Sequence, residues 1–185
     1  ALVKTSEGLG YTPWILNAVE SRNQAQKHVV FEKIQRYFKD GLKNKTFALW
    51  GLSFKPNTDD MREAPSRVLM EALWQAGARV QAFDPAAMEE TQHIYGDRPD
   101  LMLCGTKEAA LMGADALVIM TEWKNFRVPD FERMKSALKT PAIFDGRNLY
   151  DPQRLADQGI QYFGMGRKNA VATTCPQPQR KVIAE

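Results

Sequence analysis

Cysteine is scarce in this chain of 185 residues, and it has neither long apolar runs nor blocks of one charge. The two cysteines, Cys104 and Cys175, are too few and too unpatterned for a disulfide framework or a zinc site. No apolar run approaches the roughly 20 residues that a membrane-spanning helix needs, and nothing at the start is typical of a signal peptide. These absences favour a reduced, cytoplasmic setting and predict neither a metal ion nor a membrane as a partner.

The charge distribution gives little support for nucleic-acid binding. The 25 Lys and Arg residues exceed the 22 Asp and Glu residues only slightly, which leaves a formal charge of +3. Aromatic residues do not alternate with Lys and Arg on any expected strand, as stacking on single-stranded nucleic acid would require. An anionic small molecule needs only a few local cations. The sequence therefore predicts no nucleic-acid partner.

From Thr46 onward, short apolar runs alternate with segments of helical character. Strands are expected at 46–52, 79–83, 101–104, 116–120, 141–144 and 161–163, and helices at 65–75, 86–94, 107–112, 130–138 and 152–158. This alternation predicts right-handed crossovers and a mainly parallel sheet covered on both faces. The fold class is therefore α/β, a Rossmann-like, doubly wound sheet preceded by a long helix.

The long helix is expected at about residues 13–39. Thr12 is typical of an N-cap residue and Pro13 of a first helical residue, and no Gly or Pro interrupts the residues that follow. Residues 20–28 contain a single apolar side chain. That stretch faces solvent, a partner or a binding site, and the sequence leaves these three alternatives open.

The segment Gly51–Ser66 is the clearest sign of function. It is a polar loop between the first strand and the first domain helix, it opens on a glycine, and it includes the cations Lys55 and Arg62. The helix N-terminus near Pro65 directs free N–H groups and a partial positive charge toward this loop. Ligands of parallel sheets contact the loops after the strands, which adds Arg147 after the fifth strand. The pattern predicts a ligand that carries phosphate.

The same segment resembles the UDP-glucose 6-dehydrogenase family at the start of its C-terminal domain. The family pattern there reads Gly-x-x-Phe-Lys-x-x-Thr-x-Asp-x-Arg-Glu-x-Pro, and every position of it is present from Gly51 to Pro65. Two later segments, Val118–Trp123 and Ile143–Asn148, resemble further landmarks of that domain in the same order. The resemblance runs from about residue 1 to residue 166.

The resemblance implies a role for each candidate site residue. Phe54, Lys55 and Arg147 are expected to contact the UDP-sugar substrate, and Arg62 is expected to hold the pyrophosphate of the NAD cofactor. An arginine grips two oxygens through its planar fork, whereas a lysine makes a point contact. Considered without the resemblance, Phe54 fits a core position as well as a ligand contact, and Lys55 and Arg147 fit solvated surface positions as well as ligand contacts. Trp123 is assigned to packing.

The family oxidises UDP-glucose to UDP-glucuronate with two NAD+ in two steps, through a cysteine in a Gly-Gly-x-Cys-Phe-x-Lys-Asp motif. Neither Cys104 nor Cys175 has those neighbours, so no catalytic residue is expected here. The segment after the first strand also lacks the Gly-x-Gly-x-x-Gly fingerprint, which the family has in a separate N-terminal domain. The chain begins at Ala1 without methionine. We expect it to be a C-terminal piece that binds UDP but is inactive alone.

The resemblance implies three parts: residues 1–42 end a central helical dimerisation domain, residues 43–166 form the UDP-sugar-binding domain, and residues 167–185 are a flexible tail. The full-length protein is expected to be a homodimer. Two alternatives stay open. The chain could be the same part of another nucleotide-sugar dehydrogenase, acting on UDP-N-acetylmannosamine or GDP-mannose, or a stand-alone nucleotide-binding module. Fold and family alone do not fix the sugar.

Overall fold

The computed structural model describes residues 2–167, which build a sheet of six parallel strands in the order β3-β2-β1-β4-β5-β6. The strands are β1 Thr46–Trp50, β2 Arg79–Phe83, β3 Leu101–Leu103, β4 Ala116–Ile119, β5 Ala142–Asp145 and β6 Gln161–Phe163. The strand order reverses between β1 and β4, which is the topological switch point of a doubly wound sheet. The predicted Rossmann-like class is confirmed. The expected tail at 167–185 lies, apart from its first residue, outside the described residues.

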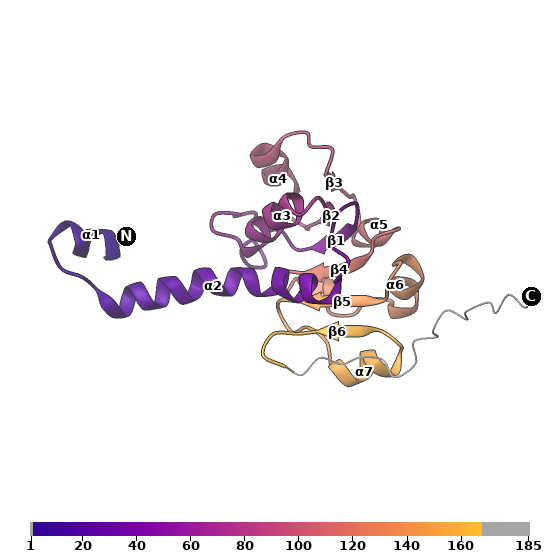
Figure 1. The fold of residues 1–185 in the computed structure, drawn as a ribbon. Coiled ribbons are helices and arrows are strands. Elements are labelled where there is room, and N and C mark those ends of the chain that lie inside the picture. The colour runs from indigo at the N-terminus through magenta and orange to yellow at the C-terminus, as the bar shows by residue number, and fades with distance from the viewer. Residues whose placement is uncertain (1, 168–185) are drawn as a thin grey trace, which may run out of the picture.

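Helices connect the strands and cover both faces of the sheet (Figure 1). They are α1 Leu2–Gly8, α2 Trp14–Tyr37, α3 Pro65–Gln75, α4 Met88–Tyr95, α5 Lys107–Leu111, α6 Phe131–Ala137 and α7 Pro152–Asp157, with a 3₁₀ turn at Lys124–Phe126. From residue 46 onward every predicted strand and helix is present, with ends displaced by two residues at most. Neither α1 nor the 3₁₀ turn is predicted from the sequence, because both are too short for a periodic pattern to show.

Alternating side chains of the strands divide the core into two layers, since successive residues of a strand point to opposite faces. Phe47 and Leu49 of β1 pack on one side with α2, α3 and α4. Ala48 and Trp50 pack on the other side with α5, α6 and α7. The central strands β1, β4 and β5 are buried on both faces, which is why they read as continuous apolar runs in the sequence.

The helix α2 packs on the domain with its C-terminal half and extends away from it with its N-terminal half (Figure 1). Val30 and Ile34 are buried, whereas Ile15 is 80% exposed. The N-cap predicted at Thr12 is wrong: the helix begins one residue later, at Trp14, and no side chain caps it. The carbonyl of Thr12 instead accepts the N–H of Trp14 in a tight turn. Among residues 2–167, no helix is long and apolar enough to cross a membrane.

At the switch point, the loops after β1 and β4 touch each other. Gly51 has a φ of +91°, and a Cβ atom added there would lie 2.6 Å from the backbone nitrogen of Thr121. The Thr121 hydroxyl donates to the carbonyl of Ser53 at 2.6 Å. Protein atoms therefore fill the place where a dinucleotide-binding sheet of this kind leaves a crevice for the pyrophosphate.

Gly51→Ala is expected to destabilise the fold by roughly 3 kcal/mol, because it adds a strained backbone conformation to an overpacked contact. Urea unfolding of the purified chain measures the change. Gly105→Ala is the control, since a Cβ there meets nothing within 4 Å, and it is expected to change stability by less than about 0.5 kcal/mol. Equal stability of the two variants would show that the Gly51–Thr121 contact is loose.

Candidate functional site

A cleft of about 840 Å³ opens beyond the carboxyl end of the sheet, between α2 and the loops that follow β1, β4 and β5. Phe54, Met120 and Arg147 line it from these three loops. Glu63 lines it from just before α3, and Pro65 lines it as the first residue of that helix. The opposite wall is the polar stretch of α2, whose role the sequence left open. That stretch contributes the following side chains: Glu20, Asn23, Gln24, Gln26 and Lys27.

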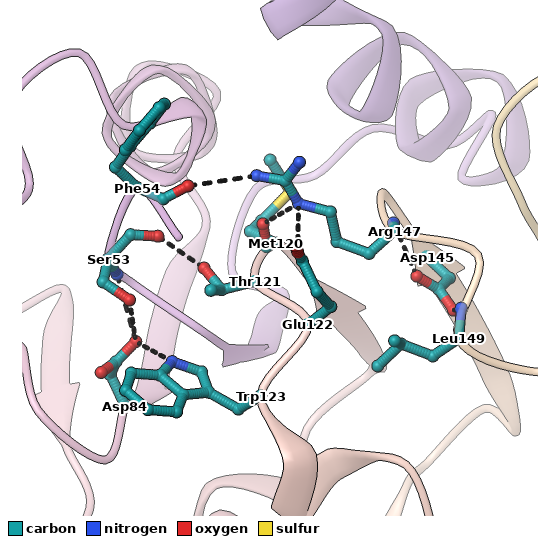
Figure 2. A network of polar contacts seen from close by, with 10 residues as sticks. All are labelled: Ser53, Phe54, Asp84, Met120, Thr121, Glu122, Trp123, Asp145, Arg147 and Leu149. Carbon is teal, nitrogen blue, oxygen red and sulfur yellow. Dashed lines mark hydrogen bonds and ion pairs between the residues drawn. The ribbon is translucent and has the colours of Figure 1, made fainter. Parts of the chain in front are cut away.

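Arg147 joins the three loops at the base of the cleft (Figure 2). Its Nε donates to the carbonyl of Met120 at 2.8 Å, and its Nη2 donates to the carbonyl of Phe54 at 3.3 Å. The buried Oε2 of Glu122 lies 3.1 Å from Nε and forms an ion pair with it. Within the described residues, this same oxygen accepts no hydrogen bond. The guanidinium is therefore fixed from one side, and its Nη1 makes no hydrogen bond within residues 2–167.

The loop that presents Arg147 is shaped by the buried carboxylate of Asp145. Its Oδ1 accepts the backbone N–H of Arg147 at 2.8 Å, and its Oδ2 accepts the N–H of Leu149 and the hydroxyl of Tyr162. Burial raises the pKa of Asp145, and these hydrogen bonds oppose that shift. The Asp-Gly-Arg segment thus combines a structural aspartate with a cation that reaches the cleft. The same short segment can therefore shape the loop and present a cation to the cleft.

A second buried carboxylate, Asp84 at the end of β2, holds the other loops together. Its Oδ2 accepts from the backbone N–H groups of Leu52 and Ser53, the Ser53 hydroxyl and the indole N–H of Trp123, at 2.7–3.1 Å. Its Oδ1 accepts two N–H groups of its own loop. Trp123 packs against the core as expected, and its indole N–H also links β4 to β2 (Figure 2).

The predicted site residues separate into two groups. Phe54, which is 46% exposed, and Arg147 line the cleft together. Lys55 and Arg62 lie on the same loop as Phe54 but are exposed and outside the lining. Arg62 binds the carboxylate of Asp60 through Nε and Nη2 and is 88% exposed. This pairing lowers the pKa of Asp60 to about 2.

The cleft also contains an ion pair that the sequence analysis did not identify. The Nζ atom of Lys27 lies 2.6 Å from Oε2 of Glu63, which connects α2 to the residues before α3. The only signal for it in the sequence was the polar stretch 20–28, which does not say what that stretch faces. Among residues 2–167, no three His, Cys, Asp or Glu side chains are placed to hold a metal ion.

Arg62→Gln is expected to raise the pKa of Asp60 from about 2 toward its ordinary value of 3.8, because the guanidinium hydrogen bond is the largest cause of the shift. Only the hydrogen bond from the backbone N–H of residue 62 stays in place. In the unaltered chain the pair stabilises the fold above pH 3.8, and this contribution is lost as the pH falls through about 2. Carboxyl-carbon NMR titration measures both values. Arg98→Gln, which breaks the Arg98–Asp100 pair instead, should leave Asp60 unchanged. A normal Asp60 pKa in the unaltered chain would contradict the pairing.

Comparisons with known proteins agree with this geometry. Residues 48–152 match the UDP binding domain of the UDP-glucose/GDP-mannose dehydrogenase family. UDP-glucose 6-dehydrogenase of Pseudomonas aeruginosa is 47% identical over 92% of this chain and 38% of its own length. The enzyme of that name from Rhizobium meliloti is 37% identical over 90% of this chain and 38% of its own length. The chain therefore spans less than two fifths of these relatives.

A solved structure shows the same relation in three dimensions. The UDP-glucose dehydrogenase from Pyrobaculum islandicum superposes with a TM-score of 0.69 at 28% identity, over 80% of this chain and 32% of that chain. The family match covers more than half of the chain and includes the loops after β1, β4 and β5 that carry Phe54, Glu122 and Arg147. The chain belongs to the UDP-glucose/GDP-mannose dehydrogenase family.

Proposed function

We propose that this chain is the UDP-binding part of a UDP-glucose 6-dehydrogenase, which converts UDP-glucose and two NAD+ to UDP-glucuronate. The observation that carries the proposal is the Arg147 guanidinium, which two backbone carbonyls and Glu122 fix at the base of the cleft. Because it is already ordered, little side-chain entropy is lost when it binds an anion. The P. aeruginosa and R. meliloti relatives of this name support the choice of enzyme.

The cleft suits a nucleoside diphosphate in size and chemistry. Its volume of about 840 Å³ lies within the usual range for small-molecule sites. Arg147 offers its Nη1 group to a phosphate or sugar oxygen, and Phe54 offers an exposed ring to the apolar face of a base or sugar. Lys55 follows Phe54 directly, and we assign to it a point contact made when the ligand draws its loop inward.

We assign the main NAD site and the catalytic cysteine to parts of the enzyme outside this chain. The Gly51–Thr121 contact does not fit a pyrophosphate at the switch point of this sheet. Arg62 is the group proposed to reach the cofactor from this side, by exchanging Asp60 for a phosphate oxygen. Cys104 is buried, and burial raises its pKa, which disfavours the nucleophilic thiolate. NADH formation from UDP-glucose by this chain alone would contradict the assignment.

The same proposal includes the division of the chain and its assembly. Residues 1–42 are assigned to the end of a central helical domain, residues 43–166 to the UDP-sugar domain, and the whole enzyme is proposed to be a cytoplasmic homodimer. Trp14 and Ile15, on the extended half of α2, are 78% and 80% exposed, which supports burial against another part of the assembly. Sedimentation of a longer chain that includes the preceding domain would test the homodimer, and a monomer would contradict it.

The alternative is the same part of an enzyme acting on UDP-N-acetylmannosamine or GDP-mannose, since the family description includes GDP-mannose dehydrogenases. A stand-alone nucleotide-binding module is less favoured, because the relatives named above are more than twice as long as this chain.

Arg147→Ala and Lys55→Ala are each expected to weaken UDP binding by roughly 1.5–3 kcal/mol, because each removes a charged hydrogen bond. Arg62→Ala is expected to leave UDP affinity nearly unchanged, since Arg62 is assigned to NAD. Isothermal titration calorimetry with UDP measures all three. A loss at Arg62 equal to the loss at Arg147 would show that the two nucleotides are divided wrongly between these residues.

Two control variants separate binding from folding in this series. Arg127→Ala removes an exposed arginine that does not line the cleft, and it is expected to bind UDP as the unaltered chain does. Arg147→Lys keeps the charge but loses the fork that joins Met120 to Phe54, so it should recover part of the affinity. Thermal unfolding of each variant shows how much of any loss comes from the loops themselves.

A further inference from the structure

The Lys27–Glu63 ion pair has two unequally buried partners. The Lys27 side chain is 14% exposed and lies in the α2 wall of the cleft, whereas the Glu63 side chain is 79% exposed. Lys27 accordingly lowers the pKa of Glu63 and keeps it ionised. An exposed carboxylate returns to water at little cost, whereas the largely buried Lys27 side chain would be left without its charged partner.

Lys27 and Arg147 are cations that line the cleft from different walls. Both side chains line the same cavity, one from the helix wall and one from the loop after β5. The other charged residues in the lining are Lys4, Glu20 and Glu63. Withdrawal of the Glu63 carboxylate would therefore leave the cleft with three cations and one anion. That balance suits the multiple negative charge of a diphosphate.

The Glu63 side chain is exposed, and the residue belongs to the loop before α3, not to a strand of the sheet. Its backbone lies in the left-handed region with a φ of +57°, which is uncommon for a residue other than glycine. Its carboxylate accepts a hydrogen bond from Lys27 Nζ at 2.6 Å, and a weaker interaction with the Gln24 side chain of the same wall also lowers its pKa. The carboxylate oxygen on Lys27 thus occupies a position where an anionic oxygen of a ligand could bind.

We infer that Lys27 is a second diphosphate-binding cation of this cleft, and that the Glu63 carboxylate holds it until a phosphate oxygen replaces that carboxylate. This inference rests on the proposed function and deepens it. It assigns a binding role to α2, which lies outside the segment 48–152 that matches the family's UDP binding domain. Glu63 then acts as an internal competitor of the ligand.

The test is calorimetric titration of the chain and its variants with UDP and with inorganic pyrophosphate. Lys27→Gln is expected to weaken binding of both probes about tenfold, the loss of one charged hydrogen bond. Glu63→Gln is expected to strengthen binding about threefold, because the competing carboxylate is gone. Lys27→Arg keeps the cation and should retain most of the affinity. The double variant should bind as weakly as Lys27→Gln.

The opposite signs of the two single variants separate a ligand contact from a structural one. Both variants break the same ion pair, so thermal unfolding should change similarly in each. If the pair only fastens α2 to the loop, UDP affinity will fall alike in both variants or change in neither, and that result overturns the inference. Loss of affinity in Lys27→Arg equal to that in Lys27→Gln overturns it as well.

The pyrophosphate titration distinguishes failure of this inference from failure of the proposed function. If the unaltered chain binds UDP but Lys27→Gln does not change the affinity, the inference fails and the proposed function stands. If Lys27→Gln weakens pyrophosphate binding but the unaltered chain binds UDP no more tightly than pyrophosphate, the proposed function fails and the role of Lys27 stands. If neither probe binds the unaltered chain, both fail.

Discussion

The buried carboxylate of Asp84 fixes the end of the sheet at which the cleft lies. It collects N–H donors from the loop after β1 and from Trp123 in the loop after β4, on either side of the switch point. Together with the contact between Gly51 and Thr121, it closes the crevice in which doubly wound sheets usually bind dinucleotides. The cleft therefore lies beside the switch point, between the end of β5 and α2.

This position of the cleft changes the kind of group that meets the ligand. A glycine-rich loop binds pyrophosphate with backbone N–H groups, whereas this cleft offers side-chain cations and one exposed aromatic ring. Arg147 has two roles here, because it joins the loops after β1 and β4 and also faces the cleft. The second wall comes from α2, so the helix that precedes the sheet is part of the site.

The sequence predicted most of the fold because apolar runs and helical segments alternate clearly after Thr46. It also placed Phe54 and Arg147 near each other, since both follow parallel strands, and the family resemblance implied that a UDP-sugar contacts them. It could not show the Lys27–Glu63 pair, because the docking of α2 relates residues 36 positions apart and leaves no periodic signal. Nor did it show that Arg62 binds Asp60, a short-range contact that depends on the loop conformation.

The central claim is that this cleft recognises UDP. Its most direct test is isothermal titration of the unaltered chain with UDP, with GDP and NAD as parallel ligands at the same ionic strength. The account predicts that UDP binds more tightly than GDP and that NAD binds weakly. Equal affinity for UDP and GDP, or tighter binding of NAD than of UDP, would contradict it.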